Sequence, residues 1–76
     1  MKVYKITWRD AVGEDVGWTD LEIVKKEHVC DVHSVGFVIS EKEDCITLCM
    51  SFEPENEKVG AYLTIPKALI VEQIEL

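Results

Sequence analysis

Apolar and polar residues alternate along several short segments of the chain, and a period of two is typical of β-strands that bury one face. In the first such segment Tyr4, Ile6 and Trp8 alternate with polar side chains. The predicted strands are residues 2–9, 29–40, 45–52, 59–65 and 70–76. The pattern therefore predicts five strands.

The long connection after the first strand shows no such alternation. Residues 10–17 contain two glycines and three acids, which is typical of an exposed loop. Thr19 followed by Glu22 matches a capping box, which predicts a short helix after it. Leu21 and Val24 lie three residues apart, so we expect them to form the buried face of this helix.

Glycine and proline divide the remaining strands. Gly36 interrupts the second strand and predicts a bend, a bulge or a close approach of another backbone. Pro66 cannot donate a ladder hydrogen bond, so we expect it to end the fourth strand and to begin a tight, 3₁₀-like turn. Polar turns are predicted at residues 41–44 and 54–58.

Short antiparallel strands with one early helix and a one-turn break before the last strand predict a mainly β domain spanning residues 1–76. We expect a small five-stranded antiparallel barrel of the SH3-like or Sm-like kind. The alternative is an α+β fold in which the helix covers one face of a two-layer arrangement. Such folds carry many functions, so neither determines one.

The composition excludes some partners. Fifteen acids against eight bases give a formal charge of −7, and the bases are spread along the chain. Such a field disfavours duplex nucleic acid and anionic membranes. No apolar run approaches the roughly 18 residues of a membrane span, and the first residues do not resemble a signal peptide, so we expect a cytoplasmic protein. The three cysteines are an odd number and are interpreted as small buried or half-buried apolar residues.

The sequence gives only weak indications of a catalytic site or a metal site. Asp31, His33 and Ser34 are the residue types of a hydrolytic triad, but adjacent strand positions point to opposite faces, so His33 and Ser34 cannot act together. Cys45 and Cys49 lie about 13 Å apart along one strand, too far to share an ion. We therefore expect no enzyme activity, no metal and no cofactor.

Two indoles and two cations are the candidate ligand-binding residues. Trp8 continues the apolar face of the first strand, which favours a place in the core, whereas Trp18 could offer an exposed platform to a planar ligand. Arg9 ends the first strand and Lys67 follows Pro66. We expect both cations to gather at one rim near Trp18, where they could bind an anionic group.

Two apolar runs exceed what one small barrel can bury. Residues 35–39 and 68–71 are apolar on both faces, and Gly36 and Gly60 would let another backbone approach. Contact between identical copies is the simplest way to bury these two runs. The sequence therefore predicts a homo-oligomer.

The pieces ITWRDA, GW before an acidic helix start, SVGFVIS and LTIPKALIVEQIEL, in this order, resemble a widespread family of short bacteriophage and prophage proteins. The resemblance covers nearly the whole chain and implies a non-catalytic accessory protein in the cytoplasm of an infected bacterium. One expectation is an anti-defence role in which the oligomer sequesters a small anionic signalling molecule of host immunity, such as a cyclic nucleotide. The alternative is an interaction module that binds a host or phage protein through an acidic or apolar surface.

Overall fold

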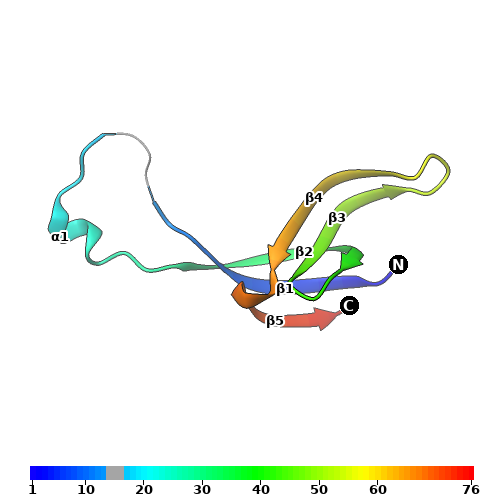
Figure 1. The fold of residues 1–76 in the computed structure, drawn as a ribbon. Helices are drawn as coiled ribbons and strands as arrows, with labels where there is room; N and C mark the ends of the chain where they lie inside the picture. The colour runs from blue at the N-terminus through cyan, green and yellow to red at the C-terminus, as the bar shows by residue number, and fades with distance from the viewer. Residues whose placement is uncertain (14–16) are drawn as a thin grey trace.

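A computed structural model of the chain describes residues 1–13 and 17–76. It contains five strands, one short α-helix and one 3₁₀ turn (Figure 1). In chain order the elements are β1 (Val3–Asp10), α1 (Leu21–Val24), β2 (Cys30–Glu41), β3 (Cys45–Glu53), β4 (Lys58–Pro66), η1 (Lys67–Leu69) and β5 (Ile70–Glu75). The predicted mainly β fold with five antiparallel strands and one short helix is confirmed.

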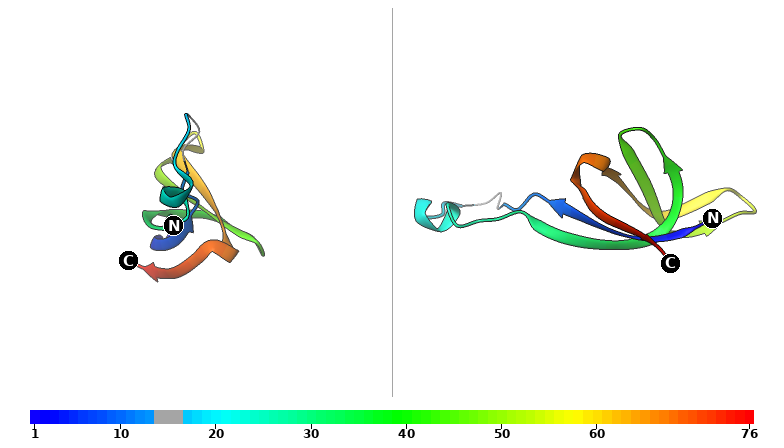
Figure 2. Two further views of the ribbon diagram at one scale, coloured as in Figure 1. Left: turned by 90° about the vertical axis from the view of Figure 1, so that its left-hand side faces the viewer. Right: turned by 90° about the horizontal axis from the view of Figure 1, so that it is seen from below.

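The strands form a single sheet in the order β4-β3-β2-β1-β5, and each pair of neighbours is antiparallel. A long connection joins β1 to β2, two short turns join β2 to β3 and β3 to β4, and η1 then redirects the chain to the far side of β1. The sheet is not closed into a barrel, because its two edges, β4 and β5, do not pair with each other. The sheet is strongly curved instead (Figure 2).

The core is small and lies on one face of the sheet. Ile6, Ile46, Leu48 and Ile65 are its buried members. Half-buried Tyr4, Trp8, Val38 and Ile70 pack around them. These residues come from all five strands, so the alternation in the sequence does place one apolar face together.

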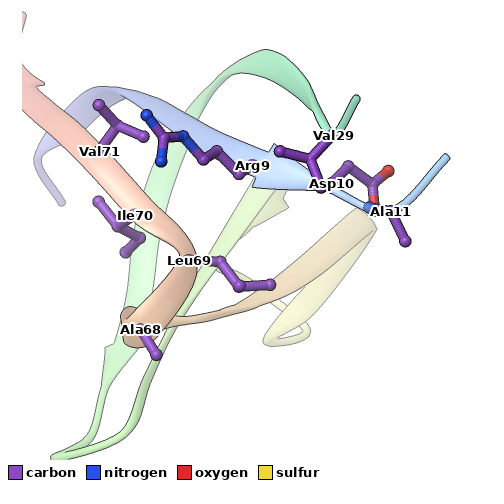
Figure 3. Close-up of a pocket in the computed structure, with 8 residues that line it drawn as sticks. All are labelled: Arg9, Asp10, Ala11, Val29, Ala68, Leu69, Ile70 and Val71. Carbon is purple, nitrogen blue, oxygen red and sulfur yellow. The ribbon is translucent and has the colours of Figure 1, made fainter. Parts of the chain in front are cut away.

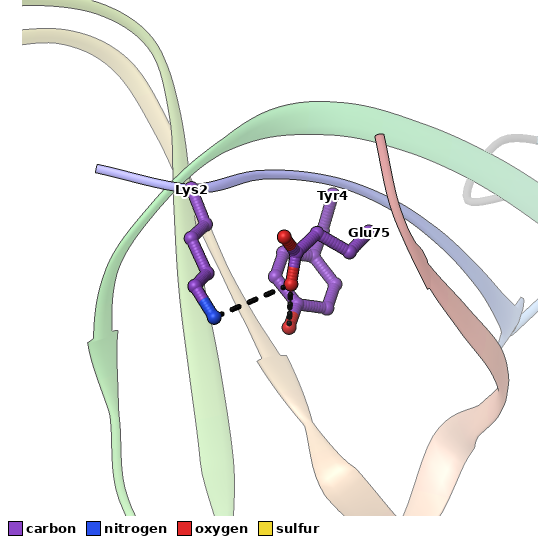
Figure 4. Close-up of polar contacts among 3 residues, drawn as sticks. All are labelled: Lys2, Tyr4 and Glu75. Carbon is purple, nitrogen blue, oxygen red and sulfur yellow. Dashed lines mark hydrogen bonds and ion pairs between the residues drawn. The ribbon is translucent and has the colours of Figure 1, made fainter.

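The edge strand β5 is fixed at both ends. At its start η1 is tied to the β2–β3 turn, where the Lys67 backbone N–H donates to the Asp44 carbonyl at 2.8 Å. At its end Glu75 Oε1 accepts a hydrogen bond from the Tyr4 hydroxyl at 3.3 Å and forms an ion pair with Lys2 Nζ at 3.3 Å (Figure 4). These contacts hold β5 beside β1 although it has only six residues.

The described parts of the connection between β1 and β2, residues 11–13 and 17–29, stand away from the sheet as an arm that contains α1 (Figure 1). With the arm, the molecule measures 52 × 24 × 21 Å. None of the α1 residues is buried, so the prediction that Leu21 and Val24 face a core is wrong. The alternative in which the helix covers a sheet face is also not observed, because the arm carries α1 away from the sheet.

The predicted capping box does not form. Asp20, not Thr19, is the N-cap residue of α1, and no side chain hydrogen-bonds to the first turn. The expected loop of residues 10–17 begins one residue later, because β1 includes Asp10, and part of it lies outside the described residues. No helix in residues 1–13 and 17–76 is long and apolar enough to cross a membrane.

Candidate functional site

An open hollow of about 430 Å³ lies where the arm leaves the sheet (Figure 3). It is bounded by the end of β1, the residue before β2, η1 and the first residues of β5. Its lining residues are Arg9, Asp10, Ala11, Val29, Ala68, Leu69, Ile70 and Val71. We refer to it as the Arg9 hollow.

The hollow follows from a mismatch between β1 and β5. Their register shifts after Thr7, and the pairing ends at Trp8 with Ile70. Arg9 and Asp10 therefore pair only with β2, on the other side of β1. The position beside them that a longer β5 would occupy is bordered instead by η1, which leaves a hollow.

One cation and two carboxylates determine the charge at this site. Arg9 Nε lies 3.6 Å from Oδ1 of Asp31, its cross-strand partner. Both side chains are more than half exposed, so this ion pair is weak and easily displaced. Asp10 also lines the hollow, and its Oδ1 accepts a hydrogen bond from the Ala11 backbone N–H at 2.8 Å.

The wall opposite Arg9 is apolar. Val29 precedes β2, and Ala68 to Val71 supply the rest of the wall from η1 and β5. In Figure 3 the guanidinium of Arg9 points toward Val71. A guanidinium beside an aliphatic wall can bind the anionic group of a ligand while the wall contacts its apolar part.

The second predicted cation does not share this hollow. Lys67 Nζ pairs with Glu41 Oε2 at 2.8 Å, and only a third of its side chain is exposed. The same residue is held through its backbone by the β2–β3 turn. Lys67 therefore faces the junction of η1 with β2, although its neighbour Ala68 lines the Arg9 hollow.

The two tryptophans lie in different environments. Trp8 is half-buried against the core, and its indole N–H donates to Ser34 Oγ at 3.0 Å. Trp18 lies on the arm and is fully exposed, at 103% of its reference surface. The structure thus does not bring Arg9, Lys67, Trp8 and Trp18 into one pocket, and only Arg9 lines the hollow.

The residues of the apparent triad are separated as strand geometry requires. His33 Nδ1 lies 2.9 Å from Thr7 Oγ1 on one face of the sheet. Ser34 points to the opposite face, toward Trp8. Asp31 is engaged by Arg9, so these side chains form no nucleophile and base pair.

The cysteines occupy three different environments. Cys49 is buried and Cys45 is half-buried, as expected, whereas Cys30 is exposed, which corrects its interpretation as an apolar residue of the interior. Cys30 begins β2 at the base of the arm, where no other element covers it. Within the described part of the chain, no group of three or more His, Cys, Asp or Glu side chains is placed to hold a metal ion.

Two parts of the site were not identified from the sequence. Asp31 was considered only as a triad member, and its pairing with Arg9 depends on the register of β1 with β2. The sequence pattern marks the run from Ala68 to Val71 only as surface for another copy, and the structure adds that this run forms the apolar wall of the hollow. Two features of the sequence indicate this site. Arg9 is a charged residue at the end of one strand, and an apolar turn precedes the strand that pairs with it.

Comparison of the chain with protein-family models, with curated proteins and with solved structures finds no match. The geometry of the Arg9 hollow and the exposed apolar surfaces are therefore the observations that bear on function.

Proposed function

We propose that this chain is a non-catalytic binding protein that works as a homo-oligomer and holds a small ligand in the Arg9 hollow. The ligand combines an anionic group with an apolar or planar body. The observation that supports this proposal is a hollow of about 430 Å³ in which a single guanidinium faces an aliphatic wall.

The size and chemistry of the hollow agree with a small ligand. Ligand sites typically enclose about 300 to 1,000 Å³ and combine an apolar lining with a few polar groups. The guanidinium of Arg9 offers a planar fork that suits phosphate or carboxylate. Its weak pairing with Asp31 keeps the side chain at the rim without holding it tightly, so an anionic ligand can replace Asp31.

The resemblance to short phage proteins suggests the class of ligand. A signalling nucleotide of host immunity carries phosphate for Arg9 and a base for the apolar wall. A protein that binds such a molecule without altering it lowers the free concentration that reaches the host receptor. We therefore propose an accessory, anti-defence role in the cytoplasm of an infected bacterium.

A panel of cyclic and linear nucleotides tests this proposal by thermal denaturation. A ligand that binds only the folded state raises the melting temperature, because it adds stability that grows with the logarithm of its concentration, about 2.7 kcal/mol at a hundredfold excess over Kd. We expect at least one nucleotide to raise the melting temperature of the wild-type protein, and to raise that of Arg9→Ala by less at the same concentration. If no nucleotide has an effect at millimolar concentration, the proposed ligand class is wrong.

A second candidate function is docking on a host or phage protein. The observation that favours it is the arm, where Trp18 and neighbouring apolar side chains are exposed around α1. Tryptophan is enriched among the residues that contribute most to protein interfaces. Under this alternative, Trp18→Ala abolishes binding of the partner whereas Arg9→Ala leaves that binding unchanged.

A further inference from the structure

The apolar face of the sheet continues beyond the core into the β3–β4 hairpin. Along β3 the side chains on this face change from buried to exposed, with Ile46 at 1%, Leu48 at 3% and Met50 at 70%. Cross-strand partners Phe52 and Val59 lie farther out on the same face and are also exposed. Figure 1 shows why: the β3–β4 hairpin extends past the ends of β1 and β5, which therefore do not cover it.

We call the exposed residues Met50, Phe52, Val59 and Leu63 the hairpin face. A second hollow, of about 240 Å³, opens beside it between β2, β3 and β4. Ala61, which has a small side chain, lines this hollow together with the larger Met50 and Leu63. The hairpin face is thus an apolar surface with a depression that can receive a side chain.

The arm is the second uncovered apolar surface. Its exposed apolar side chains surround α1 and include Trp18, Leu21, Ile23, Val24 and Val29. α1 has only four residues and no buried side chain, and so short a helix is not stable without packing against something else. The arm therefore lacks a packing partner within a single copy.

The two surfaces lie at opposite ends of the long axis of the molecule. α1 is at one end and the tip of the β3–β4 hairpin at the other (Figure 1). The molecule is 52 Å long but only 24 × 21 Å across, so an arm cannot reach the hairpin face of its own copy. In an antiparallel pair of copies, each arm would lie beside the hairpin face of the other.

We propose that two copies of this chain associate about a two-fold axis and that the arm of each covers the hairpin face of the other. The proposal rests on the homo-oligomer that is part of the proposed function, and it names the surfaces that form it. A two-fold pair is closed, because both contacts form together and no further copy is needed.

The arm carries two lysines beside Asp20, Glu22 and Glu27, and these lysines can attract the glutamates near the tip of the hairpin. Lys25 and Lys26 follow the last residue of α1, beside Leu21 and Val24. Glu53 ends β3, Glu55 and Glu57 lie in the turn after it, and Lys58 begins β4. Lys25 pairs with Glu22 at 3.3 Å, but both side chains are largely exposed, so Lys25 can exchange Glu22 for a glutamate of the second copy. This arrangement favours an arm on a hairpin over two hairpins together, because two hairpin tips would bring glutamates beside glutamates.

The pair must bury an interface of the usual size to be stable. A stable pair buries roughly 1,200 to 2,000 Å² in total, which is about a tenth or more of the surface of two copies that expose 6170 Å² each. The arm and the hairpin face together contribute nine exposed apolar side chains, and the contact is made twice. An external protein that binds the arm alone would leave the hairpin face uncovered.

The test compares Met50→Glu with Tyr62→Glu by sedimentation velocity. Met50 and Tyr62 are both 70% exposed and lie on neighbouring strands, but they point to opposite faces of the hairpin. Because both side chains are exposed in a single copy, neither change should unfold it. We expect Met50→Glu to raise the Kd of the dimer by about a hundredfold, and Tyr62→Glu to leave it within about twofold of wild type.

A mixing experiment shows which surface meets which. Leu21→Glu on the arm should also dissociate the pair. An equimolar mixture of Leu21→Glu and Met50→Glu still allows one intact contact, between the wild-type arm of one variant and the wild-type hairpin face of the other. We expect the mixture to form mixed dimers at concentrations where each variant alone is monomeric.

The outcomes separate this inference from the proposed function. Mixed dimers support the arm-to-hairpin contact. If the mixture stays monomeric while both variants disrupt the wild-type dimer, arms pair with arms or hairpins with hairpins, and the inference is overturned. A wild-type dimer that Met50→Glu leaves intact also overturns it but leaves the homo-oligomer standing. A wild-type protein that is monomeric contradicts both, whereas ligand binding at Arg9 is tested independently by the nucleotide panel.

Discussion

Ala61 has a backbone conformation that is unusual for its residue type. It lies within β4 with φ of 52°, in the left-handed region that glycine adopts readily and other residues avoid. Its neighbour Gly60 has the residue type suited to such a position but does not adopt it. This backbone conformation is therefore unfavourable in itself, and the surrounding strand pairing holds Ala61 in it.

Ala61→Gly should therefore stabilise the protein. Relief of the left-handed strain is worth about 1 to 2 kcal/mol, and the greater freedom of glycine in the unfolded chain offsets about 0.5 to 1 kcal/mol of it. We expect a net gain of about 0.5 to 1 kcal/mol, seen in urea denaturation as a higher midpoint with an unchanged slope. A lower midpoint would show that Ala61 is not strained.

Arg9 and Lys67 provide a matched pair for the ligand site. Each substitution by alanine removes one positive charge, but only Arg9 lines the hollow. With a nucleotide found in the thermal screen, we expect Arg9→Ala to weaken binding by about 1.5 to 3 kcal/mol, the usual contribution of a hydrogen bond to a charged group. Lys67→Ala should leave affinity nearly unchanged in calorimetry. Equal losses in both variants would place the ligand nearer η1 and β2 than the hollow.

At the residue scale, the sequence correctly placed side chains whose environment depends on their own strand. The alternation in β1 puts Ile6 in the core and Trp8 against it. It could not place Lys67, because its partner Glu41 belongs to a strand that is 26 residues away. Nor could it pair Arg9 with Asp31, since cross-strand partners depend on a register that the strand pattern alone does not define.

At the scale of elements, Gly36 has the close contact that its position in β2 suggested. A Cβ atom there would lie 2.6 Å from the backbone oxygen of Cys49 in β3. At Gly60, which was expected to behave in the same way, the nearest atom would be Ser51 Cβ at an ordinary 3.6 Å. The irregularity in the β2–β3 register lies after Val38 and not at Gly36.

These two glycines give a direct test of β2–β3 packing. Gly36→Ala should destabilise the protein by about 1 to 3 kcal/mol, because strand β2 must move away from β3 to admit the methyl group. Gly60→Ala should change stability by less than about 1 kcal/mol. Urea denaturation of both variants measures the difference. Equal stabilities would mean that the two strands lie farther apart than the structure shows.

The five strands were predictable because alternation reports burial within each segment, whereas the helix was predicted with the wrong cap and the wrong face. Asp20 occupies the N-cap, one residue after the predicted Thr19. The expectation that Leu21 faces a core assumed that α1 folds back on the sheet. Whether a helix packs on its own sheet depends on the path of the whole connection, which local spacing does not encode.

At the scale of the whole molecule, closure of the sheet was the feature that the sequence could not provide. A barrel requires the edges β4 and β5 to pair, and the structure leaves them apart. The core of Ile6, Ile46, Leu48 and Ile65 is correspondingly small. The apolar runs that suggested an oligomer do remain partly uncovered, as Val35 and Val71 show.

An uncovered arm and an uncovered hairpin face make assembly the central claim about this protein. The mass of the full chain in solution, measured by light scattering at micromolar concentration, tests that claim most directly. We predict about twice the 8.7 kDa of a single copy, with a fall toward the single-copy mass on dilution. A mass of 8.7 kDa throughout the micromolar range would contradict the account.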